Sequence, residues 1–172
     1  AYHNQLSGLI TRVNSPKDSL QGYPVYSKQN VGEAEIWGAE CDFQWALNKK
    51  MQIKGGAFFT VGENISDNEP MRRIPPAMFN ATWMFQYNVN WKFVATVYGA
   101  KAQNRLAKAD IQDNRIGAAG TTGYVTGDLR CRYQRRGVYV DFALTNVGNQ
   151  RYKTHGSGVF MPGRAFQLLV GF

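Results

Sequence analysis

The chain has 172 residues, of which 44% are apolar and 13% aromatic, with a formal net charge of +8 and a pI near 9.6. This length fits one domain, and the sequence contains no apolar run of about 18 residues, which excludes a transmembrane helix. Lysines and arginines are scattered without a dense block, so the positive charge indicates a solvated surface and polar interior, and no nucleic-acid partner is expected. The composition fits a soluble β-sandwich or a membrane β-barrel, in which lipid-facing and lumen-facing residues alternate.

Apolar and polar residues alternate with period two in eight segments, which predicts eight β-strands. The alternation is clearest around Trp83, where apolar Phe79, Ala81, Trp83 and Phe85 alternate with Asn80, Thr82, Met84 and Gln86. The predicted strands are residues 2–13, 28–47, 51–61, 77–87, 91–100, 124–133, 138–145 and 165–172.

The connections between these strands are alternately long and short. Long polar loops are predicted at 14–23, 62–76, 101–123 and 146–163, and short turns at 48–50, 88–90 and 134–137. Bacterial outer-membrane barrels have this pattern, with short periplasmic turns and longer extracellular loops, whereas a β-sandwich has no reason to keep it. Tyr87 and Trp91 flank one short turn, as interfacial aromatics do. The sequence therefore predicts an all-β fold, an antiparallel up-and-down meander of about eight strands that is part of a transmembrane β-barrel.

Charged residues occupy the predicted inward face of two strands. Glu40 and Asp42 share one face of a strand, and two unpaired carboxylates are too costly for a soluble core but cost little in a wet lumen. Asp128, Arg130 and Arg132 share the inward face of another strand. In the simpler interpretation, these three side chains are a row of charged groups that face the lumen. In the alternative interpretation, they contact a ligand.

Arg72 and Arg73 precede Pro75 and Pro76 in a predicted loop. Two adjacent guanidinium groups could bind an anion. The alternative is a loop that the two prolines anchor, without a ligand.

Cysteine and histidine give no sign of a metal site. Cys41 and Cys131 lack CxxC spacing and fall on the predicted outward face as small apolar residues, with a disulfide as the alternative. His3 and His155 have no neighbours at metal-ligand spacing. No Ser-His-Asp arrangement, GxSxG or phosphate-binding glycine loop is present, so neither a metal, a cofactor nor an enzymatic activity is expected.

Several motifs together resemble the C-terminal part of the barrel of a TonB-dependent outer-membrane receptor. Singly they are weak, but they follow the family's order over nearly the whole chain, with a mild departure at Asn149, where the family typically has Asp. They are residues 30–40 (NVGEAEIWGAE), 72–76 (RRIPP), 104–107 (NRLA), 113–116 (DNRI), 120–124 (GTTGY), 144–152 (LTNVGNQRY), 155–158 (HGSG) and 162–164 (PGR), with the terminal Phe172.

The resemblance implies a fold and a function. Residues 1–172 would be the last eight strands of a barrel of roughly 22 strands with a plugged lumen, and the plug and its TonB-binding box have no counterpart here. The receptor would import a scarce ligand, such as a metal chelate, cobalamin or a glycan, across the bacterial outer membrane. Its partners would be outer-membrane lipid, the remaining strands and plug, and the TonB complex that supplies energy through the plug.

The resemblance also gives Phe172 a role. Outer-membrane proteins of this kind end on an aromatic residue that the barrel-assembly machinery recognises, so Phe172 is an expected assembly signal. A girdle aromatic at the periplasmic interface is the alternative interpretation.

The sequence is also compatible with two other classes of protein. One is a self-contained small outer-membrane β-barrel with a structural or enzymatic role, since eight strands can close on themselves. The other is a soluble β-sandwich that acts as a binding module. For a wide barrel, strands 2–13 and 165–172 would pair with another polypeptide, because lipid cannot satisfy an unpaired strand edge.

Overall fold

The computed structural model describes residues 1–8, 10–20, 23–30 and 32–172. Leu9, Gln21, Gly22 and Val31 lie outside the described residues. They include one position each of the predicted strands 2–13 and 28–47, and two of the predicted loop 14–23.

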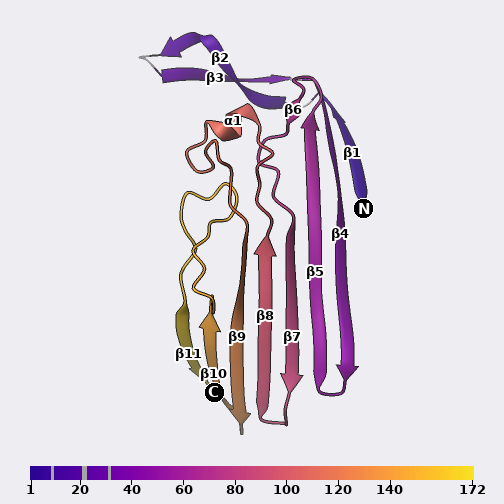
Figure 1. The fold of residues 1–172 in the computed structure, drawn as a ribbon, viewed down its shortest axis with the longest axis vertical. Coiled ribbons are helices and arrows are strands. Elements are labelled where there is room, and N and C mark those ends of the chain that lie inside the picture. The colour runs from indigo at the N-terminus through magenta and orange to yellow at the C-terminus, as the bar shows by residue number, and fades with distance from the viewer. Residues whose placement is uncertain (9, 21–22, 31) are drawn as a thin grey trace.

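One large antiparallel sheet dominates the structure and follows the chain as a meander (Figure 1). Each strand of this sheet pairs with the next one along the chain, with two exceptions. A separate hairpin is inserted between the first two strands of the sheet, and the two-residue β6 (Glu69–Pro70) pairs only with the end of β5. This arrangement confirms the predicted antiparallel meander. In sheet order the strands are β1 (Tyr2–Ser7), β4 (Glu33–Asn48), β5 (Met51–Asn64), β7 (Met78–Gln86), β8 (Trp91–Ala100), β9 (Tyr124–Arg135), β10 (Val138–Thr145) and β11 (Ala165–Gly171).

The prediction was wrong between residues 8 and 32. The predicted loop 14–23 lies largely in a two-stranded hairpin, β2 (Ile10–Leu20) and β3 (Tyr23–Asn30), which extends beyond the top of the main sheet (Figure 1). The predicted strands 2–13 and 28–47 are each divided by it. Gly8 and Gly32 flank the hairpin with φ of 70° and 95°. Glycine adopts this left-handed region without steric cost, so the chain can leave the sheet and re-enter it there.

The two ends of the sheet differ in their connections. At the turn end, β4–β5, β7–β8 and β9–β10 are joined by two to four residues, and the side-chain oxygens of Asn48 and Asn88 each accept two backbone hydrogen bonds that close a turn. In the third turn, Arg136 and Gly137 both have positive φ, as a type I′ hairpin requires. At the loop end, three long segments connect the strands: residues 65–77, 101–123 and 146–164.

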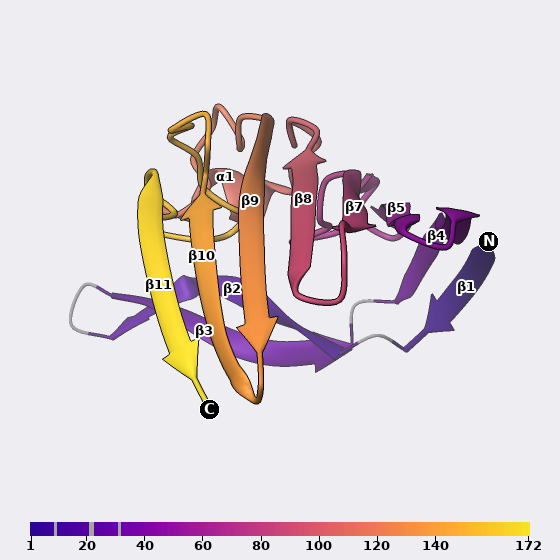
Figure 2. The same cartoon turned by 90° about the horizontal axis from the view of Figure 1, so that it is seen from below.

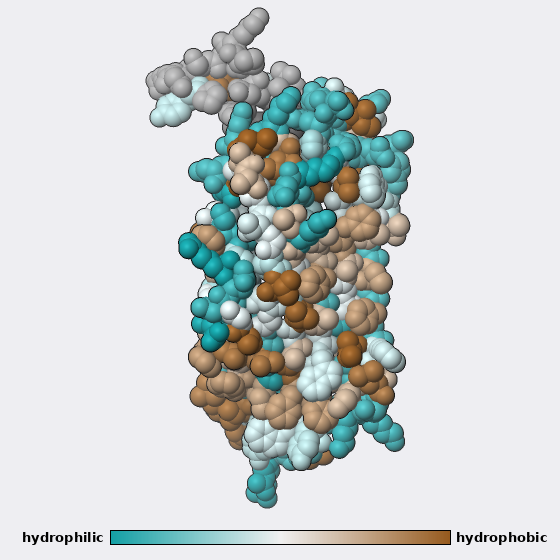
Figure 3. All heavy atoms as spheres, in the orientation of Figure 1, coloured by the Kyte–Doolittle hydropathy of each residue, from teal (hydrophilic) through white to brown (hydrophobic). Residues whose placement is uncertain are grey.

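The outward face of the sheet carries an apolar band. Cross-strand partners place Ile53, Trp83 and Ala95 in one row, and many large apolar side chains on this face are exposed. Figure 3 shows polar residues gathered over the loop end and at the bottom tip, with most apolar residues between them. Exposed members of the band include Trp37, Phe43, Trp45, Phe59, Phe79, Leu129, Phe142, Phe166, Leu168 and Val170.

The inward face is polar along the strands and has a small core at the loop end. Thr82 and Thr96 share a hydrogen bond of 3.1 Å across β7 and β8. The core consists of buried Ala100, Tyr124 and Tyr152, with Met78 and Tyr98 packed against it. None of the helices among the described residues has the length and hydrophobicity of a membrane span.

The two outer strands of the sheet do not meet. Among the described residues, β1 pairs only with β4 and β11 pairs only with β10. Figure 2 shows β1 and β11 at opposite sides of the curved sheet. Each therefore has one edge whose backbone groups have no strand partner in the part of the chain that the structure describes.

Candidate functional site

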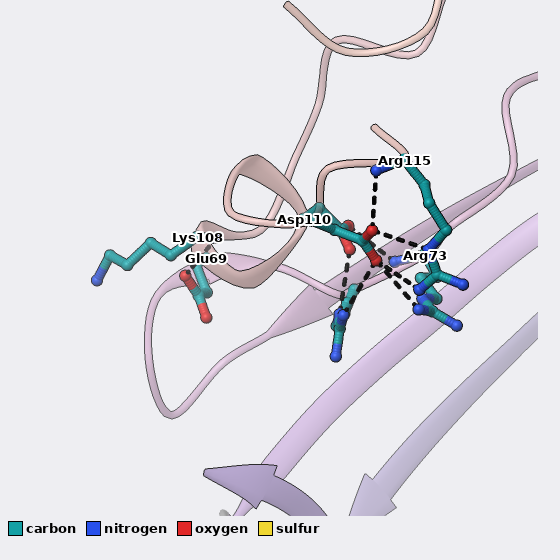
Figure 4. Close-up of polar contacts among 7 residues, drawn as sticks. Glu69, Arg73, Lys108, Asp110 and Arg115 are labelled. Carbon is teal, nitrogen blue, oxygen red and sulfur yellow. Dashed lines mark hydrogen bonds and ion pairs between the residues drawn. The ribbon is translucent and has the colours of Figure 1, made fainter. Parts of the chain in front are cut away.

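The short helix α1 (Lys108–Ile111) lies within the connection between β8 and β9 and places Asp110 against the connection that precedes β7 (Figure 4). Asp110 is only 1% exposed. Its carboxylate accepts hydrogen bonds from the backbone N–H of Arg73 at 2.9 Å and from Nε of Arg72 at 3.3 Å. A buried carboxylate that accepts from a charged donor and a backbone N–H joins these two loops firmly.

Asp113 collects three guanidinium groups. Its carboxylate accepts from Arg115 at 2.7 Å and 2.9 Å, from Arg73 at 3.1 Å and from Arg72 at 3.4 Å. Hydrogen bonds from Arg115 hold the pKa of Asp113 well below its usual value, and the pairing raises the pKa of Arg115. Arg72, Arg73, Arg115, Asp110 and Asp113 are named the arginine cluster below.

The arginine cluster has a net charge of +1, because three guanidinium groups face two carboxylates. The side chains of Arg72, Arg73 and Arg115 are 43%, 49% and 43% exposed. Each has a terminal nitrogen, Nη1, with no hydrogen-bond partner among the described residues. The cluster therefore presents N–H donors and positive charge to solvent, which can bind an anion.

The third loop adds His155 beside the arginine cluster. His155 Nδ1 and Thr121 Oγ1 are hydrogen-bonded at 2.9 Å, while the buried Nε2 has no partner among the described residues. Burial lowers the pKa of His155, nearby Asp110 opposes this shift, and Arg73 adds to it. The preceding Tyr152 stacks on Tyr124 with ring centroids 4.0 Å apart, which holds the loop against the inward face.

The residues predicted on β9 lie on the inward face, and two of them have partners within the chain. Arg132 forms an ion pair with Asp141 of β10, in which Nε donates to Oδ1 at 2.8 Å. Asp128 Oδ1 accepts the backbone N–H of Asn146 at 2.9 Å. Arg130 is exposed, and no hydrogen bond or ion pair joins it to another described residue.

Sequence reasoning brought together Arg72 and Arg73 but missed their carboxylate partners Asp110 and Asp113. The structure keeps the loop-end pair and the three residues of β9 as two separate groups. The ligand role assigned to all five stays a prediction. The only sequence signal for the partners was the DNRI motif, which contains Asp113 and Arg115.

Asn146 is a further residue that the sequence did not mark as special. It is 3% exposed with φ of 47°. Its side chain accepts from Thr126 and from the backbone of Gln150, and donates to the backbone oxygens of Gln150 and Pro162. This one amide, the third residue of the LTNVGNQRY motif, therefore fixes both ends of the last loop.

The remaining predicted positions are Phe172 and the two cysteines, none of which belongs to the arginine cluster. Phe172 is fully exposed, and the strand before it runs to the turn end, since Gly171 pairs with Tyr139. Its assembly role stays a prediction. Cys41 and Cys131 are unpaired. No cluster of potential metal ligands occurs among the residues the structure describes.

A curved antiparallel sheet with an apolar outward band, a polar inward face and long loops at one end is a segment of an outer-membrane β-barrel wall. The sequence matches the family model "TonB dependent receptor-like, beta-barrel" over residues 1–149. The chain belongs to this family of receptors of the bacterial outer membrane.

Named relatives agree with this family. An iron-regulated outer membrane virulence protein of Vibrio cholerae serotype O1 is 28% identical over an alignment of 102 residues, which covers 54% of this chain and 15% of the relative. The structure of the copper transporter OprC matches 98% of this chain with a TM-score of 0.78 at 19% identity. The siderophore receptor PiuA from Acinetobacter baumannii matches 96% with a TM-score of 0.66 at 17% identity. The chain spans 27% and 24% of the lengths of those two proteins.

Proposed function

We propose that residues 1–172 form the C-terminal part of the barrel of a TonB-dependent receptor that imports a scarce ligand. The observation that carries this proposal is the open sheet, whose edges at β1 and β11 have no strand partner among the described residues. A membrane-embedded edge needs a partner, and further strands of a wide barrel supply one. A plug inside that barrel and the TonB complex are the remaining partners in this proposal.

Among a metal chelate, cobalamin and a glycan, a metal chelate has the best support. The names of the relatives refer to iron regulation, copper transport and siderophore reception. The exposed N–H donors and net positive charge of the arginine cluster suit an anionic chelate. In this proposal Arg72 and Arg73 meet the ligand at the loop end, and unpaired Arg130, between Asp128 and Arg132, lies along its route on the inward face.

Uptake by cells that carry the full-length receptor tests the transport proposal. Import of a radiolabelled anionic metal chelate is expected to require both the receptor and an active TonB complex. Import that continues without the TonB complex, or an absence of uptake across a panel of iron and copper chelates, would contradict the proposed function.

Binding to the same cells at low temperature tests the ligand contact separately from transport. The double variant Arg72→Gln/Arg73→Gln should bind the anionic chelate about tenfold more weakly or worse, as expected for lost charged hydrogen bonds. Lys108→Gln removes one charge from the same end of the molecule, outside the arginine cluster, and should bind normally. Equal binding by the double variant and the native receptor would remove the cluster from the ligand site.

The alternative is a self-contained barrel of these eight strands with a structural or enzymatic role. It requires β1 to pair with β11, and the described structure does not pair them. An antibody against residues 146–164 distinguishes the two. A band at about the 19.3 kDa of this chain in native outer membranes would support the small barrel, and a band several times larger would support the receptor.

A further inference from the structure

An apolar groove crosses the outward face near the loop end. It has a volume of about 570 Å³ and is lined by residues of β4, β5, β7, β8 and β9, with Ala77 and Lys101 beside them. Alternation along the strands places Ala39, Cys41, Ala57 and Ala77 on its floor, with Phe59 and Phe79 beside them. Glu40 and Phe58 also belong to the lining, but alternation places them on the inward face, between the outward residues of β4 and β5.

Aromatic rings lie against glycines and leave this floor open. A Cβ added at Gly55 would come within 3.0 Å of the Phe43 ring, and one at Gly99 within 2.8 Å of the Phe79 ring. Both rings therefore cover glycine backbone instead of the small side chains between them. Ala57 and Cys41 stay exposed as a result.

The groove continues into a polar hollow toward the loop end. This hollow has a volume of about 360 Å³ and shares Phe59, Ala77 and Lys101 with the groove. Its other polar lining residues are Thr60, Gln103, Asn104 and Arg105.

Lys101 supplies a positive charge at this junction. Its neighbour Ala100 is buried against Tyr124 on the inward side, so alternation turns Lys101 outward. Lys101 is exposed, and its ammonium has no partner among the described residues. Arg105, by contrast, is occupied by an ion pair with Glu63 and by a hydrogen bond of 3.0 Å to the carbonyl oxygen of Gly62.

We propose that this groove and hollow bind one phosphate-bearing lipid of the outer leaflet. An acyl chain lies along the apolar floor, and the phosphate meets Lys101 where the apolar band ends. Charge complementarity selects this occupant, since the neutral Arg105–Glu63 pair leaves Lys101 as the net charge of the hollow. A lysine at this depth reaches the head-group region while its stem covers apolar surface.

A second groove on the same face gives a matched comparison. It has a volume of about 440 Å³ and is lined by Trp83, Ala95, Leu129, Phe142 and others. Its one charged lining residue, Arg130, belongs to the inward row. The second groove is therefore apolar without an outward cation and should not select a phosphate-bearing lipid.

Native mass spectrometry of the full-length protein, purified from outer membranes in mild detergent and supplied with lipid A, tests the proposal. Lys101→Gln should lower the bound fraction of lipid A about fivefold, the effect expected for one cation at an anionic surface. Lys101→Arg and Lys108→Gln should retain it. Unchanged binding in Lys101→Gln, or an equal loss in Lys108→Gln, would overturn the proposal.

The groove itself is tested by filling it. Ala57→Leu places a larger apolar side chain on the floor, where it still faces hydrocarbon, and should displace lipid A. Ala95→Leu makes the same change in the second groove and should not. Equal behaviour of these two variants, or equal retention of lipid A from which the phosphates have been removed, would show that the site does not recognise a phosphorylated lipid.

Discussion

The membrane-spanning band and the loop end of this molecule are held together by different means. In the band, every strand pairs with its neighbours through backbone hydrogen bonds, to which side chains add cross-strand contacts such as Thr82–Thr96 and Arg132–Asp141. At the loop end, Asp110 and Asp113 join residues 37 to 41 positions away through side chains. The band therefore tolerates changes that keep the character of a face, whereas the loop end depends on individual groups.

The largest expected effect comes from breaking the outward face of the band. Trp83→Arg would put a charge into hydrocarbon, so it should lower the free energy of unfolding of the full-length protein by about 2–4 kcal/mol if Trp83 lies near the midplane. Thr82 faces the lumen, so Thr82→Arg should lower the free energy of unfolding much less, by the loss of one hydrogen bond to Thr96. Unfolding titrations in lipid vesicles measure both, and equal costs would refute the assignment of the two faces.

A smaller effect is expected from the loop end. Asp110→Ala removes a buried acceptor from Arg72 and from the backbone N–H of Arg73, which should cost about 1–3 kcal/mol of local stability. Protease digestion of intact cells should then cut within 65–77 and 101–123 faster than in the native protein. The unfolding midpoint of the band should stay unchanged, and a parallel loss of band stability would show that the two regions are not independent.

The turn end should respond more weakly again. Asn88→Ala removes the acceptor of two backbone hydrogen bonds in the β7–β8 turn, at an expected cost of about 0.5–1.5 kcal/mol. Asn88→Asp keeps an acceptor oxygen at the same place and serves as the control. Unfolding titrations in which both variants lose the same stability would argue against this role of the side-chain oxygen.

The smallest expected effect is a dependence of the last loop on pH. Burial lowers the pKa of His155, so its neutral form stabilises the fold fully above the ordinary value of 6.5, and this contribution is lost as pH falls from 6.5 through the lowered pKa. Hydrogen exchange in 152–157 should become faster between pH 7.5 and pH 5, and His155→Gln should abolish the change. Asp113, whose pKa is also lowered, keeps its charge in this window and loses its contribution only below its ordinary value of 3.8.

The band could be predicted from sequence because its rule is local. Period-two alternation placed strand 77–87 within one residue of β7, and strand 91–100 coincides with β8. The hairpin β2–β3 was missed for two reasons. Pro16, Asp18 and Ser19 favour turns but lie within β2, and the positive φ of Gly8 and Gly32, where the chain leaves and re-enters the sheet, is not visible in the alternation of residue types.

The candidate site could be predicted only in part. Arg72 and Arg73 stand out as an adjacent pair, but nothing local connects them with Asp110 or Asp113. Those contacts depend on how two loops fold against each other, and α1, which orients Asp110, has only four residues and no side-chain cap. A helix this short has little intrinsic stability, so the sequence carries no clear sign of it.

The height of the apolar band has a consequence for the bilayer that suits this protein. On β4 the outward row is apolar from Trp37 to Leu47, about 33 Å of strand, which a tilt of about 40° reduces to a span of roughly 25 Å. Directly above it, Glu35 and Glu63 face outward side by side, Glu35 in contact with His3 and Glu63 in its ion pair with Arg105. A thick membrane would draw these two carboxylates into hydrocarbon, whereas a thin one leaves them in water. Hydrophobic thickness alone therefore favours thin bilayers, such as the bacterial outer membrane, over thicker ones.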